Sequence, residues 1–224
     1  MSKKVDLLGD KSARMGALKE FTQYDTKFSN ESDANACGAT CLVAGAAIQG
    51  GQKGLQDLVR VIEERGDATP DKVTDTKWTE GKIAEFEKLP GIKERINNNT
   101  ATQQDLADLK TIVYKQLRQV EKKEGHEFRD ATINIDAMKE YINTDVKVWG
   151  KDQPLKGMFD QMNVKLVDTT GDGKGNHFVL FFNDGKGSGE NALYDPWPHK
   201  SGSQVTTDPA EMLVYHQNVH NATR

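Results

Sequence analysis

Apolar residues recur at helical spacing through the first half of the chain. This period predicts helices over residues 37–48, 55–64, 79–88 and 102–123. Gly50-Gly51 and Gly66 follow the first two segments and predict where those helices end. Residues 1–35 are polar and mixed, so we expect an extended N-terminal arm that packs against the body of the protein.

In the second half the pattern changes to short apolar runs of strand length. We expect strands over residues 146–149, 164–167, 177–182, 192–194 and 212–215, and helices over 135–142 and 154–162. Helices followed by a mostly antiparallel sheet indicate an α+β fold. The expected unit is a single domain over 1–224, in which about 66–125 is a helical insertion and 144–218 is the sheet-rich half.

The composition and charge of the chain limit which classes of partner are expected. The 224 residues are 36% apolar and 29% charged, with a formal net charge of −4, which is typical of a soluble globular protein. The chain has no long basic run, so nucleic acid is not an expected partner. It also has no apolar segment of membrane-spanning length and no signal-peptide pattern, so we expect synthesis in the cytoplasm without a cleaved signal.

Neither a disulfide nor a metal site is expected. Cys37 and Cys41 lie one helical turn apart, where their side chains stack without reaching bridge geometry, so both should be free thiols. Together with His177 and His199 they match no standard zinc spacing. The loop that begins at Asp168 resembles a calcium loop, but Val179 occupies the position that needs a bidentate glutamate, so we expect no metal or cofactor.

Cys37 lies where a helix is expected to begin. With Asn35 as the N-cap, the thiol falls in the first turn and faces the positive end of the helix dipole. That position lowers the pKa of a thiol toward neutrality. A backbone N–H of the same turn can act as an oxyanion donor, so Cys37 is a candidate nucleophile.

The segments 177–183 and 190–195 predict a hairpin that presents an imidazole beside a carboxylate. If Lys186 is the midpoint of the glycine-rich turn, His177 pairs directly with Asp195 and Val179 with Leu193. Asp195 then fixes the tautomer of His177, and the other ring nitrogen takes the proton of Cys37.

At these residues the chain resembles the papain-like cysteine peptidase superfamily, most closely the branch related to bacteriocin-leader-processing peptidases. The resemblance rests on Cys37-Gly38-Ala39-Thr40-Cys41-Leu42, His177-Phe178-Val179 and Asp195-Pro196. It implies a papain-like fold, with the nucleophile helix packed on the sheet, and hydrolysis through a thioester on Cys37. The family also has a glutamine upstream of the thiol as second oxyanion donor; Gln23 is the candidate here, with Asn30 and Asn35 as alternatives.

The resemblance also implies a biological setting. Enzymes of this type include bacterial effectors and toxins that a dedicated secretion system delivers into a target cell, which would make a protein or peptidoglycan amide the substrate and a cognate inhibitor an expected partner. Peptidase action is the leading prediction. A peptidoglycan amidase or glutamine deamidase with the same triad is the first alternative, and a non-catalytic binding module on this fold is the second.

Overall fold

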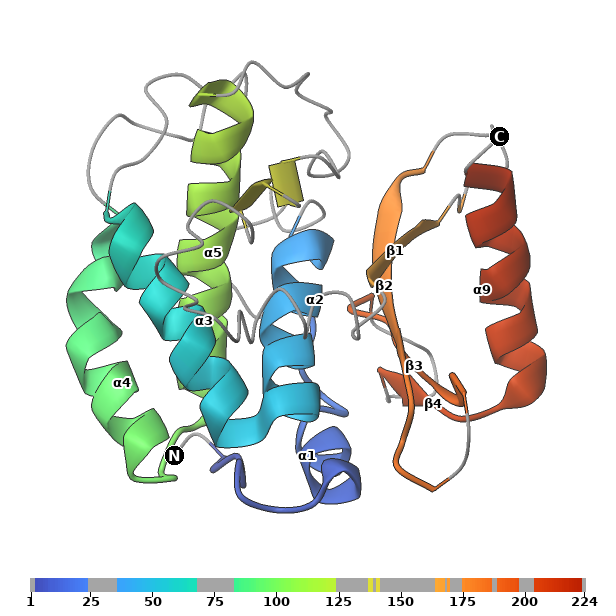
Figure 1. The fold of residues 1–224 in the computed structure, drawn as a ribbon, viewed down its shortest axis with the longest axis horizontal. Coiled ribbons are helices and arrows are strands. Elements are labelled where there is room, and N and C mark those ends of the chain that lie inside the picture. Colours follow the sequence, from blue (N-terminus) through green and yellow to red (C-terminus); the bar gives the residue numbers. More distant parts are fainter. Residues whose placement is uncertain are drawn as a thin grey trace.

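The computed structural model describes residues 3–23, 36–67, 83–123, 137–138, 140–141, 164–167, 169, 175–186, 189–197 and 204–222. These residues form an α+β fold in which helices cover one face of a four-stranded antiparallel sheet and a C-terminal helix covers the other (Figure 1). The predicted α+β class is therefore confirmed. In chain order the elements are α1 (Lys11–Ala17), α2 (Cys37–Gly45), the π-helical turn η2 (Ala46–Gly50), α3 (Gly51–Arg65), the 3-10 helix η3 (Ala84–Lys88), α4 (Leu89–Asn97), α5 (Gln103–Lys123), β1 (Val164–Val167), β2 (His177–Phe182), β3 (Ala192–Tyr194), β4 (Val205–Thr206) and α9 (Pro209–Ala222).

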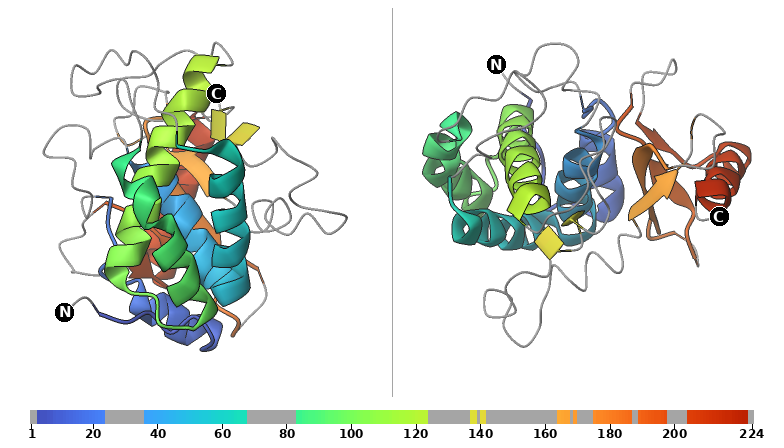
Figure 2. Two further views of the ribbon diagram at one scale, coloured as in Figure 1. Left: turned by 90° about the vertical axis from the view of Figure 1, so that its left-hand side faces the viewer. Right: turned by 90° about the horizontal axis from the view of Figure 1, so that it is seen from above.

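Helix α2 lies between α5 and the sheet (Figure 2). Every residue of this helix is buried, and it contacts α5 on one side and β2 on the other. Small residues make this close packing possible. A Cβ atom on Gly38 would lie 3.0 Å from Met138 Sδ and 3.3 Å from Phe178 Cδ2, so a larger residue would push the helix away from β2.

Strand β2 is buried on both faces. Phe178, Leu180 and Phe182 join the main core with the helices, whereas Val179 and Phe181 pack with Met212 of α9. A strand covered on both sides has no polar face, which explains why its sequence is a continuous apolar run instead of an alternating one. The sheet order is β1-β2-β3-β4.

Local signals predicted several boundaries correctly. Gly51 and Gly66 have positive φ angles of 57° and 78°, and the Gly66 N–H donates to Ile62 O at the end of α3. Thr102 and Asp105 form a capping box at the start of α5, because the Thr102 N–H donates to the Asp105 carboxylate and the Asp105 N–H donates to the Thr102 hydroxyl. Strands β1, β2 and β3 have the predicted bounds.

Three other expectations need correction. The N-terminal segment is not wholly extended, because Asp10 caps the helix α1 by accepting from the Ala13 N–H at 2.8 Å. Helix α4 was missed because Leu89-Pro90 resembles a helix stop, yet proline is well tolerated in a first turn. Within the segment 79–88, where a helix is expected, Ala84–Lys88 form the 3-10 helix η3. In the segment 135–142, the described residues are helical, as expected. The segments expected at 146–149 and 154–162 lie outside the described residues.

The strand expected at 212–215 is wrong, since these residues belong to α9. Asp208 starts the helix by accepting from the Ala210 N–H at 2.9 Å, and Pro209 occupies its first position. Met212 and Tyr215, three residues apart, face the sheet. The strand after β3 is instead β4, at Val205–Thr206.

The predicted hairpin register is wrong by two residues. Leu180 pairs with Tyr194 and Phe181 with Leu193, so Asp195 lies level with Val179 and diagonal to His177. The shift arises in the loop between the strands. There the Asn191 side chain accepts from the Asp184 N–H and donates to the Asp184 carboxylate, which ends the pairing at Phe182. Because side chains alternate with a period of two, this shift keeps Asp195 on the same face as His177.

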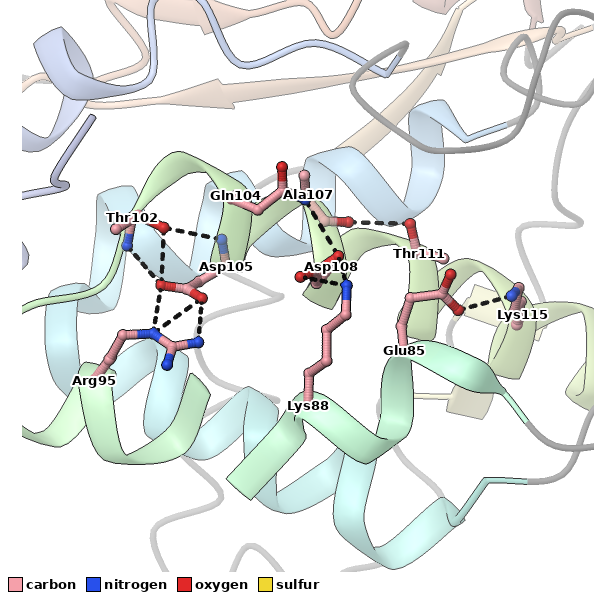
Figure 3. A network of polar contacts seen from close by, with 10 residues as sticks. All are labelled: Glu85, Lys88, Arg95, Thr102, Gln104, Asp105, Ala107, Asp108, Thr111 and Lys115. Atoms are coloured by element: carbon pink, nitrogen blue, oxygen red, sulfur yellow. Dashed lines mark hydrogen bonds and ion pairs between the residues drawn. The ribbon is translucent and has the colours of Figure 1, made fainter. Parts of the chain in front are cut away.

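A network of ion pairs ties α5 to α4 and η3 (Figure 3). Arg95 binds both oxygens of the Asp105 carboxylate, while Lys88 pairs with Asp108 at 3.0 Å and Lys115 with Glu85 at 2.8 Å. Burial by itself raises the pKa of Asp105, but the hydrogen bonds from Arg95 and Thr102 outweigh it and hold this pKa below its usual value. Asp105 therefore both caps α5 and anchors it to α4.

Replacing Asp105 by alanine is expected to lower the free energy of unfolding by about 2 kcal/mol, because it removes a cap and a bidentate pair whose arginine is partly solvated. The loss should shrink as the pH falls through the lowered pKa of Asp105, because protonation weakens the pair in the parent protein as well. Urea unfolding at pH 7 and pH 3 measures this loss in the free energy of unfolding. Asp108→Ala is the matched control on the same helix, with an expected loss of about 1 kcal/mol or less. Equal losses at the two positions would contradict the argument.

Candidate active site

Three of the predicted site residues converge at the N-terminal end of α2. His177, the first residue of β2, places its Nε2 2.7 Å from Oδ1 of Asp195, which directly follows β3. The side chain of Cys37 is hydrogen-bonded to His177. Because Asp195 engages Nε2, Nδ1 is the ring nitrogen left to exchange a proton with the thiol. The three side chains therefore form a continuous chain from thiol to imidazole to carboxylate.

Cys37 is the first residue of α2. The N-cap is Ala36, without a side-chain cap, so the helix begins one residue later than expected with Asn35 as the cap; Asn35 itself lies outside the described residues. The first-turn N–H groups of a helix have no acceptor within it, and they give this end a partial positive charge. A negative charge on the thiol, or on an oxygen beside it, is favoured at this position.

The Asp195 carboxylate is held by donors from three directions. Oδ1 accepts from His177 and, at 2.8 Å, from the Trp197 N–H. Oδ2 accepts from the Tyr215 hydroxyl of α9. A buried carboxylate with this set of donors keeps its charge and its orientation. Tyr215 was missed in the sequence because 212–215 was assigned to a strand; Asp208-Pro209 is the signal that could have revealed the helix.

The environment of His177 favours its protonated form. Burial lowers the pKa of this imidazole, but hydrogen bonds to Asp195 and Cys37, together with the charges of both, raise it from 6.5 to about 10. The site is therefore suited to an imidazolium paired with a thiolate. The ring of Trp197 meets the His177 ring edge-on, with the centroids 6.0 Å apart, and covers it from one side.

Cys41 has a different environment from Cys37. Its Sγ donates to Phe178 O at 3.4 Å, and burial together with the charges of Cys37 and Asp195 raises its pKa well above the ordinary value. Both thiols are free of disulfides, as predicted. A thiol held in its protonated form is a poor nucleophile, and Cys37 is the thiol that has an imidazole as its partner, so the reactive candidate is Cys37.

Gln23 lies beside the turn that carries Asp195. Its side chain is fully buried, and its backbone N–H donates to Pro196 O at 3.0 Å. The role of Gln23 as an oxyanion donor stays a prediction, and the alternative Asn30 lies, like Asn35, outside the described residues.

The site is closed to solvent in this structure. Cys37 has no exposed surface, and His177 and Asp195 are 6% and 3% exposed, whereas the neighbouring Trp197 is 48% exposed. The groups that bury Cys37 must therefore move before a substrate carbonyl can reach its sulfur. Within the described parts of the chain, no group of three or more His, Cys, Asp or Glu side chains is arranged to hold a metal ion. His199 and Asp168 lie outside those parts.

No family model, no curated protein and no solved structure matches this chain. None of the described helices is long and apolar enough to cross a membrane.

Proposed function

We propose that this protein is a cysteine hydrolase of papain-like architecture that attacks an amide carbonyl. The observation that carries the proposal is the connected chain Cys37, His177 and Asp195, in which the thiol lies at a helix N-terminus and the other two side chains come from adjacent strands. The architecture supports it, because the helix that bears the nucleophile packs directly on the strand that bears the base.

In the acylation step, the Cys37 sulfur forms a bond to the carbonyl carbon and the carbonyl electrons move onto the oxygen. The Cys37 N–H at the start of α2 and the side chain of Gln23 are the proposed donors to that oxyanion. When the carbonyl re-forms, the bond to the amide nitrogen breaks. His177 gives its Nδ1 proton to the departing amine, which leaves a thioester on Cys37.

In the deacylation step, neutral His177 takes a proton from water while the water oxygen attacks the thioester carbon. The carbon–sulfur bond then breaks, and the thiolate and imidazolium are restored together with a free carboxylic acid. Asp195 stays ionised throughout and keeps Nε2 protonated, so that Nδ1 is always the nitrogen that exchanges protons.

Peptide cleavage is the leading form of this reaction. Cleavage of a peptidoglycan amide and deamidation of a glutamine follow the same two steps with a different leaving amine. Delivery as a bacterial effector or toxin is part of the proposal on the strength of the sequence resemblance.

An activated acetyl ester tests the first step without knowledge of the natural substrate. Brief exposure to p-nitrophenyl acetate, acid quenching and peptide mapping by mass spectrometry should locate one acetyl group on Cys37 and none on Cys41, because the raised pKa of Cys41 keeps it protonated while Cys37 is paired with His177. In urea the two thiols should become equally reactive. Equal acetylation of both in the folded protein, or of neither, would contradict the proposal.

A further inference from the structure

A lysine lies in the core close to the proposed site. Lys110 of α5 has no exposed surface, its Nζ donates to Thr22 O, and it lies 5.0 Å from the centroid of the Phe21 ring. Burial of an ammonium group opposes folding, since the group loses its hydration. The hydrogen bond to the Thr22 carbonyl offsets part of that cost and ties α5 to the segment that precedes Gln23.

The target of Lys110 is one end of a single peptide group. The Thr22 carbonyl accepts from Lys110, and the N–H of the same peptide group, which belongs to Gln23, donates to Pro196 O at 3.0 Å. A peptide group is planar, so a hydrogen bond at each end fixes its position and its rotation. The Cα atom of Gln23 is thereby fixed as well.

The preceding residues are held by the strand that leads to Asp195. The Tyr194 hydroxyl donates to Phe21 O at 2.6 Å. The Gln204 N–H donates to Lys19 O at 2.8 Å, and Gln204 O in turn accepts from the Asp195 N–H at 2.8 Å. The segment 19–23 therefore has a fixed place relative to the carboxylate of the site, and Lys110 supplies its contact on the side of α5.

We propose that Lys110 is a positioning residue, which orients Gln23 so that its side chain can donate to the oxyanion; this inference rests on the proposed hydrolase function. Lys110 touches no reacting atom in this scheme. It acts through the Thr22–Gln23 peptide group, and it belongs to a helix that the proposed mechanism otherwise does not use.

The test compares Lys110→Met with Gln23→Ala and the double variant. Lys110→Met should slow acetylation of Cys37 by p-nitrophenyl acetate by about tenfold to a hundredfold, the size of effect seen when a catalytic donor is misplaced. Urea unfolding of the same variant measures its folded fraction, because the Thr22 carbonyl loses its donor and the rate must be compared for folded protein. In the Gln23→Ala background, Lys110→Met should cause no further loss of rate, because the side chain to be positioned is already absent.

Other outcomes would overturn the inference in distinguishable ways. An unchanged rate, or a loss of rate that multiplies with that of Gln23→Ala, would show that Lys110 does not position Gln23. A loss of rate that only matches the unfolded fraction of Lys110→Met would show the same. In all these cases wild-type acetylation of Cys37 leaves the proposed hydrolase function standing. Absence of acetylation in the wild type would remove both proposals together.

Discussion

Replacing Cys37 by alanine is expected to reduce the rate of acyl transfer at least about 10³-fold, since it removes the nucleophile of the proposed mechanism. The measurement is the release of p-nitrophenolate from p-nitrophenyl acetate, together with the mass of the protein. Cys41→Ser is the matched control four residues along the same helix. Its hydroxyl can donate to Phe178 O as the thiol does, so the rate should stay within about twofold of wild type.

The same pair of variants can identify the class of substrate in cells. Each is expressed in a bacterial host either in the cytoplasm or, with an added signal peptide, in the periplasm. Killing that depends on Cys37 only in the periplasm would indicate peptidoglycan, and killing only in the cytoplasm would indicate a cytosolic protein. Identical growth effects of wild type and Cys37→Ala in both compartments would favour a non-catalytic binding module.

Replacing Asp195 by asparagine is expected to slow acyl transfer by about 10²-fold to 10⁴-fold, because His177 loses the partner that sets its tautomer. It should also lower the pKa of His177 from about 10 toward or below 6.5, because burial then becomes the dominant influence. NMR titration of the histidine ring protons measures this change. His216→Gln serves as the control outside the triad and should leave both the rate and the titration of His177 unchanged.

The raised pKa of His177 also predicts the direction in which the stability of the protein changes with pH. Its contribution to the free energy of unfolding is fully present below pH 6.5 and is lost as the pH rises through about 10. Urea unfolding across this window should show that loss in the wild type and a weaker one in Asp195→Asn. A His177 titration near pH 6.5 in the wild type, with no change on Asp195→Asn, would show that the imidazole is not coupled to the carboxylate.

Strands β1, β2 and β3 were predictable because each is an apolar run bounded by polar or glycine residues. Helix α9 was not, because a run as short as Met212–Tyr215 fits a strand or a buried helix face equally well. The start of that helix at Asp208 and Pro209 is a local signal, but the packing of Met212 on the sheet is what selects the helical form.

The residues that could form the site were predictable from local patterns. A thiol at a helix start, and an imidazole and a carboxylate on one face of a hairpin, follow from local periodicities of 3.6 and 2 that need no knowledge of the rest of the chain. How these residues meet depends on contacts that the patterns do not encode. The hairpin register depends on hydrogen bonds within the loop, the third donor to Asp195 comes from α9, and the peptide group before Gln23 is held by Lys110 of α5. The last two contacts join segments whose distance is set by the packing of the helices on the sheet, and no local pattern encodes that distance.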